Sequence, residues 1–171
     1  MKKILKQKEI ISQIINNTES FRELIKKNWN KIDYMTLNKV TKEYLTFLMY
    51  CVIFKLQNND LSNTELDDFT KDFYKKTVEI GLLKEDDLLD YEKLSRERYL
   101  LFYQILSEGK EKDQLEGKRL NALVAKEVLL VQKLLSTCDE KENALGELYP
   151  ELFSAYNGLM LQTQLMFSEN S

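Results

Sequence analysis

Seven carboxylates in the middle of the chain could support metal-dependent chemistry, because some of them are paired at helical spacing. Glu65 and Asp68 are three residues apart, and so are Asp87 and Asp90. Residues three apart share one helix face, so two such pairs on adjacent antiparallel helices could hold Mg²⁺ by carboxylate oxygens. The pattern predicts a Mg²⁺-dependent nucleotide or phosphate hydrolase, in which nearby lysines would contact the phosphates of the substrate. Those lysines are Lys71, Lys75 and Lys76.

The paired carboxylates resemble the paired acidic motifs of all-α NTP pyrophosphohydrolases. The string DDLLD at residues 86–90 is also similar to the DDxxD motif of isoprenoid synthases. The first family usually places its acids in mid-helix, whereas Asp86 and Asp87 stand at a predicted helix start. The second family needs a much larger helical barrel and a second Asp-rich motif that faces the first. Because of these departures, the hydrolase is the alternative interpretation.

The same acidic residues also fit a surface that binds another protein. Residues 60–92 carry 11 acidic and 4 basic side chains, whereas residues 1–59 carry 5 acidic and 11 basic ones. The simplest consequence is that the basic first third packs beside the acidic middle. An exposed acidic surface would also bind a basic partner quickly and in a salt-sensitive way, by mimicking the charge of nucleic acid. The residues predicted to contact this partner are Asp67, Asp68, Asp72, Tyr74, Asp86, Asp87 and Asp90.

Basic and aromatic residues nearer the N-terminus allow a third interpretation, a nucleic-acid interface. Lysines would contact phosphates and aromatic rings would stack on bases. The residues concerned are Lys26, Lys27, Trp29 and Lys31. However, lysines opposite an apolar face are typical of any amphipathic helix. The segment at 28–35 also lacks the turn glycine of a helix-turn-helix, so nucleic-acid binding is the second alternative.

Several chemistries are excluded by residues that the chain lacks. It contains no histidine, so Ser-His-Asp and Cys-His nucleophile systems are excluded. Zinc, iron or haem sites that use a histidine ligand are excluded for the same reason. No two of its five glycines have the spacing of a phosphate-binding loop. Cys51 and Cys138 stand in apolar helical contexts, which predicts buried thiols rather than a disulfide. We therefore expect a protein that is not an enzyme and that carries no cofactor and no metal.

The elements that position these residues are all predicted to be helices. Apolar residues recur at helical spacing, and the chain has one proline, so the sequence predicts an all-α fold. Residues 35–57 are apolar nearly all round, which predicts the central helix of a bundle. A shorter stripe predicts a helix at about 3–16, which Asn16-Asn17 is expected to end. Ser20 and Glu23 have capping-box spacing, so a further helix should begin near residue 21.

The rest of the chain continues the helical pattern. Ser62 and Glu65 form a second capping box, and Gly81 is expected to end the helix that follows. Asp86 or Asp87 should cap the next helix, whose inward residues include Leu88, Tyr91 and Leu94. Later helices bring the expected number to about seven, in a single-domain helical bundle over residues 1–171 without an internal linker. Residues 168–171 should form a frayed tail.

The predicted environment is the cytoplasm, because no signal peptide and no membrane span are visible. The longest apolar run, residues 44–54, is too short to cross a bilayer. A high content of Lys, Asn and Ile indicates an AT-rich bacterial or phage genome. Taken together, the sequence predicts a non-catalytic protein-binding module, such as an adaptor, an inhibitor or an immunity-type neutraliser. Its expected partner is another protein, through the acidic surface at 60–92.

Overall fold

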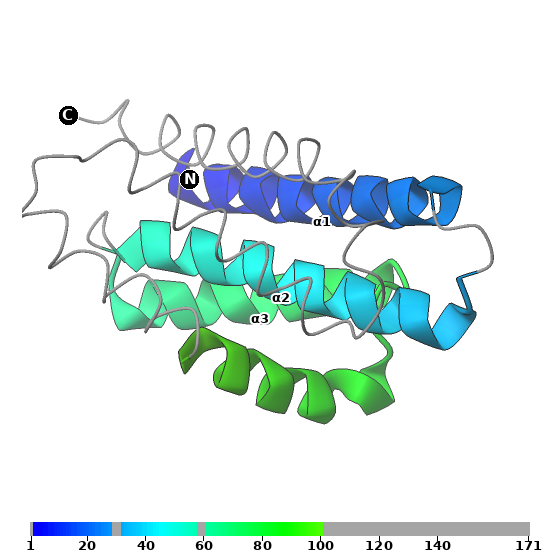
Figure 1. The fold of residues 1–171 in the computed structure, drawn as a ribbon. Coiled ribbons are helices and arrows are strands. Elements are labelled where there is room, and N and C mark those ends of the chain that lie inside the picture. Colours follow the sequence, from blue (N-terminus) through cyan, green and yellow to red (C-terminus); the bar gives the residue numbers. More distant parts are fainter. Residues whose placement is uncertain (1, 29–31, 58–60, 101–171) are drawn as a thin grey trace, which may run out of the picture.

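The fold is given by a computed structural model that describes residues 2–28, 32–57 and 61–100. Within these ranges the chain is helical and forms no strand, which confirms the all-α prediction there. The elements are α1 (Lys2–Asn28), α2 (Tyr34–Gln57), α3 (Asn63–Glu79), the short 3-10 helix η1 (Glu85–Asp87) and a fourth α-helix at 88–100. Consecutive α-helices run in opposite directions (Figure 1). Cys138, the tail at 168–171 and the helices expected after residue 100 lie outside the described residues.

α2 confirms the prediction for residues 35–57 almost to the residue. All side chains from 43 to 52 are buried, so this helix needs neighbours on every side. α2 packs against both α1 and α3. The ring of Tyr50 also lies 5.2 Å from that of Tyr99 on the fourth helix. Cys51 is buried on α2, as expected. No helix in the described part of the chain is both long enough and apolar enough for a membrane span.

α1 is one continuous helix of 27 residues. The predicted break at Asn16-Asn17, and the separate helix after it, are therefore wrong. The buried positions of α1 form one stripe through this point, namely Ile11, Ile14, Thr18, Phe21 and Ile25. Thr18 belongs to the stripe because its hydroxyl donates to the carbonyl of Ile14 at 2.8 Å. Packing of this stripe on α2 outweighs the weak helix propensity of the two asparagines.

α3 begins and ends as the sequence predicts. At its start, the Ser62 backbone N–H donates to Oε2 of Glu65 at 2.9 Å, and the Glu65 N–H donates back to Oγ of Ser62 at 3.3 Å. This reciprocal pair is the capping box. At its end, Gly81 has a φ of 72°, and its N–H donates to the carbonyl of Val78 at 2.9 Å. Glycine adopts this left-handed conformation without steric strain, which allows the turn toward η1.

Two ion pairs hold η1 and the fourth helix to α2. The guanidinium of Arg98 donates to both carboxylate oxygens of Glu43, at 2.7 and 2.8 Å. The Glu43 side chain is only 3% exposed, so the pair satisfies a carboxylate that is buried among apolar residues. The second pair joins Lys42 to Asp87 at 3.0 Å and is only partly buried. The two pairs together fix where η1 and the fourth helix lie on α2.

Proline at position 16 tests whether α1 is continuous. Because Asn16 lies in the interior of a helix, Asn16→Pro should destabilise the protein by about 3 kcal/mol or more. Asn16→Ala is the matched control and should leave the stability unchanged or slightly raised. Urea unfolding followed by circular dichroism measures both. Equal stability of the two variants would mean that the helix breaks at this point.

The buried ion pair gives a second test. Arg98→Met should destabilise by roughly 3–5 kcal/mol, because it leaves the Glu43 carboxylate buried without its cation. Lys42→Met removes the neighbouring, more exposed pair and should cost less, about 1 kcal/mol. The double variant Glu43→Met/Arg98→Met should recover much of the loss. Chemical denaturation that finds it no more stable than Arg98→Met would contradict this account.

Candidate partner-binding surface

The outer face of α3 carries charges of both signs. Asp67, Asp68 and Asp72 are exposed there, as the protein-binding interpretation requires. A groove of about 370 Å³ runs between α1 and α3, and its lining mixes Asp72 and Glu79 with lysines. It is lined by Lys8, Ile11, Ser12, Asp72, Lys75, Lys76 and Glu79. The basic first helix does lie beside the acidic third one, and the face around Asp72 is therefore not uniformly acidic.

The acidic character is stronger at η1 and the start of the fourth helix. Asp86 and Asp90 are exposed, and neither forms an ion pair within the described ranges. Asp87 differs from them, since it pairs with Lys42 of α2. Leu89 lies between these carboxylates and is 78% exposed. Residues 86, 89 and 90 have the spacing of one helix face, so an apolar side chain is flanked there by two unpaired acids.

The four carboxylates of the hydrolase interpretation are not brought together. Tyr74 of α3 and Tyr91 of the fourth helix pack at a centroid distance of 6.0 Å, which sets the register of the two antiparallel helices. In that register Asp68 and Asp87 are offset by roughly 15 Å along the helix axis, at 1.5 Å per residue. Glu65 is engaged in the capping box. Among the residues with described positions, no three carboxylates or thiols are grouped so that they could hold a metal ion.

Tyr74 is half-buried and packs inward rather than projecting to solvent. Its ring meets that of Tyr91 edge to face, with an interplanar angle of 88°. Burial, followed by the nearby Glu92 carboxylate, raises the pKa of the Tyr74 hydroxyl above its ordinary value. The structure therefore gives this ring a packing role between α3 and the fourth helix.

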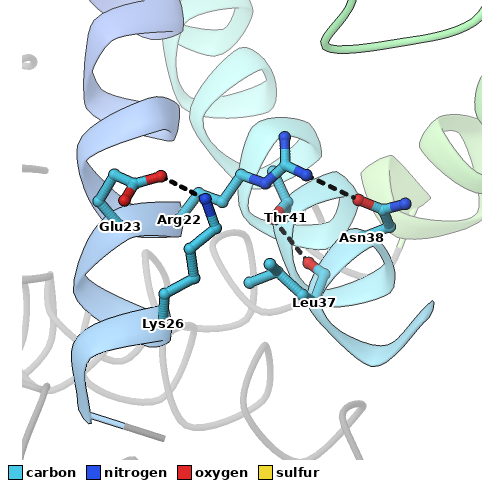
Figure 2. Close-up of polar contacts among 6 residues, drawn as sticks. All are labelled: Arg22, Glu23, Lys26, Leu37, Asn38 and Thr41. Atoms are coloured by element: carbon cyan, nitrogen blue, oxygen red, sulfur yellow. Dashed lines mark hydrogen bonds and ion pairs between the residues drawn. The ribbon is translucent and has the colours of Figure 1, made fainter. Parts of the chain in front are cut away.

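Two basic residues of the nucleic-acid interpretation, Lys26 and Lys27, lie near the end of α1, and Figure 2 shows the contact of Lys26. Lys26 forms an ion pair with Glu23 at 2.5 Å, so part of its charge is neutralised. Lys27 is exposed. Trp29 and Lys31 lie outside the described residues. Arg22 reaches from α1 to α2, where its Nη2 donates to Oδ1 of Asn38 at 3.2 Å.

Three apolar residues that are more than two thirds exposed were not among the predicted contacts. They are Met35, Leu89 and Leu100, which are 81%, 78% and 69% exposed. The signal for the two leucines was in the sequence, because both fall outside the stripe through Leu88, Tyr91 and Leu94. Tyr34, which is 64% exposed, also projects at the start of α2. Exposed apolar side chains of this size are features of binding surfaces when polar groups surround them.

Comparisons with protein-family models, with curated proteins and with solved structures give no match for this chain. The geometry of the described residues is therefore the basis for assigning a function.

Tyr91, which packs between α3 and the fourth helix, predicts a loss of stability at alkaline pH. Burial raises the pKa of Tyr91 far above the ordinary value of about 10. The unfolded chain therefore ionises this group first, and folding becomes less favourable as the pH rises above about 10. Tyr91→Phe should make that decline less steep in urea midpoints measured from pH 8 to 11, and the rest of it is expected from Tyr44 and Tyr99, whose pKa values burial also raises.

Tyr34→Phe is the control for this measurement. Tyr34 is exposed, and its hydrogen bond with Asn38 lowers the pKa of its hydroxyl. The positive charges of Lys84 and Arg22 lower this pKa further. Ionisation of this hydroxyl favours the folded state, so its removal should leave the alkaline decline at least as steep as in the parent protein. An equal flattening in both variants would contradict the assignment to Tyr91.

Proposed function

We propose that this protein is a non-catalytic protein-binding module that holds a basic partner at η1 and the start of the fourth helix. Leu89 would be the apolar anchor, and Asp86 and Asp90 would form its acidic rim. An adaptor, an inhibitor or a neutraliser of a nucleic-acid-binding protein could all work in this way. The remaining acids of the predicted surface, on α3, would add long-range attraction rather than direct contacts.

The observation that carries the proposal is the exposure of Leu89 between unpaired carboxylates. Leu89 is 78% exposed, so its side chain contributes little to the stability of the fold. Its burial by a partner would remove apolar surface from water and would therefore favour binding. Apolar anchors at the centre of an interface usually supply most of the binding energy, and a charged rim sets the rate and the specificity of association. The partner expected from this surface has an apolar pocket bordered by lysine or arginine.

The contacts of the carboxylates are a second reason to prefer a binding function to a catalytic one. Acidic side chains in the first turn of a helix offset its dipole, and Asp86 and Asp90 need no further structural role. Glu65 and Asp87 are held by Ser62 and Lys42. A metal-dependent hydrolase would need such groups to converge on one point, with their oxygens available to the ion.

Affinity capture with matched variants tests the proposal. Wild-type protein and four variants serve as baits in lysate of the source organism, and captured proteins are quantified by mass spectrometry. A partner should be lost with Asp86→Lys/Asp90→Lys and with Leu89→Ala. It should be retained with Glu9→Lys/Glu19→Lys, which reverses two exposed acids on α1, and with Leu100→Ala, which truncates the other exposed leucine of the fourth helix.

The captured protein is then purified and titrated against the same variants. Each of the first two should weaken the affinity by roughly tenfold or more, with a strong dependence on salt for the wild type. If every captured protein binds the reversed and the control variants equally, the surface at Leu89 does not bind the partner. Binding that is insensitive to salt would also contradict the acidic rim.

A further inference from the structure

Arg22 carries a half-buried positive charge that no carboxylate balances within the described chain. Its Nη2 atom donates to the neutral amide oxygen of Asn38, and its Nε atom is buried without an acceptor (Figure 2). Water solvates a half-buried guanidinium only in part, so such a group is normally paired with an anion. The pairing group for Arg22 can come from a ligand.

The acids nearest to Arg22 in these two helices are engaged elsewhere or point to solvent. Glu23 pairs with Lys26. Asp33 caps α2, where its carboxylate accepts from the backbone N–H of Thr36 at 2.9 Å and from its hydroxyl at 2.6 Å. Glu19 lies one turn before Arg22, is exposed and forms no ion pair with it. No carboxylate of these two helices therefore pairs with the guanidinium of Arg22.

The groups around Arg22 are hydrogen-bond donors. Tyr34 and Asn38 are four residues apart on α2, so they lie on the same side of that helix as the contact with Arg22. Hydrogen bonding with Asn38, followed by the charges of Lys84 and Arg22, lowers the pKa of the Tyr34 hydroxyl, which indicates a positive potential there. The amide nitrogen of Asn38, the phenol of Tyr34 and the guanidinium of Arg22 are each hydrogen-bond donors.

We propose that Arg22, Asn38 and Tyr34 form a binding site for a phosphate group. A phosphate accepts hydrogen bonds at every oxygen and suits the planar fork of an arginine. The ring of Tyr34 and the side chain of Met35 are exposed next to these donors, so they can cover an apolar or aromatic group that carries the phosphate. The site is separate from Leu89 and does not depend on the function proposed above.

Calorimetric titration with two probes, inorganic phosphate and phenyl phosphate, tests the site and distinguishes its possible ligands. Phenyl phosphate should bind more tightly than phosphate, because only the ester reaches Tyr34 and Met35 with an apolar group. Equal affinity for both probes would overturn the role of these two residues. The absence of saturable binding of either probe would overturn the site as a whole.

The decisive variant is Asn38→Asp, which is nearly isosteric and places a carboxylate beside Arg22. It should abolish phosphate binding and raise the midpoint of thermal unfolding, because it supplies the missing counter-charge. Arg22→Gln should weaken phenyl phosphate binding by roughly tenfold or more. If Arg22→Gln does not fold, Asn38→Asp keeps the test complete.

Lys27→Gln is the matched control, since it removes one exposed positive charge from the same end of α1. It should leave the affinity for phenyl phosphate nearly unchanged. An equal loss with Lys27→Gln and Arg22→Gln would mean general attraction of anions by a basic surface, as in the nucleic-acid interpretation. Retained binding or an unchanged midpoint in Asn38→Asp would also overturn the proposal.

Discussion

The described bundle depends on one constraint, which is that the middle of α2, residues 43–52, has no side chain that faces water. From residue 43 to residue 52 every side chain is buried, so other helices must cover this segment all round. α1 and α3 pack against it, and the fourth helix adds the contacts of Tyr99 and Arg98. The amphipathic stripes of the other helices are complementary to this requirement, because each buries one face on α2 and exposes the other.

The single carboxylate in this buried segment determines how the fourth helix lies. Glu43 lies in an apolar core, and Arg98 supplies the cation that pairs with its carboxylate through two hydrogen bonds. This pair and the Tyr50–Tyr99 contact fix the inward side of the fourth helix. The opposite side, with Leu89 and Leu100, is then directed away from α2. The exposure of Leu89 is therefore a consequence of packing in the core.

The sequence was informative wherever the cause of a structure is local. The bounds of α2, the capping box of Ser62 and Glu65 and the left-handed Gly81 each follow from a few neighbouring residues, and all are confirmed. The continuity of α1 was not predictable in this way, because it depends on a distant segment. Packing on α2 keeps residues 16 and 17 helical, although both are asparagines. The same limit applies to the site. Spacing placed Asp68 on one helix face, but the offset from Asp87 depends on how Tyr74 packs against Tyr91.

Charge is balanced along much of the bundle and unbalanced at one end of it. Lysines and acids alternate in the groove between α1 and α3, so neither sign prevails there. The end of α1, the start of α2 and the start of the fourth helix lie together at the other extreme of α2 from residue 57 (Figure 1). Arg22 lacks a counter-charge at this end, and so do Asp86 and Asp90. Helix termini have fewer neighbours than helix centres, so charges there more often remain without an internal partner. Both proposed contacts, one cationic and one acidic, are therefore expected at this end of the molecule.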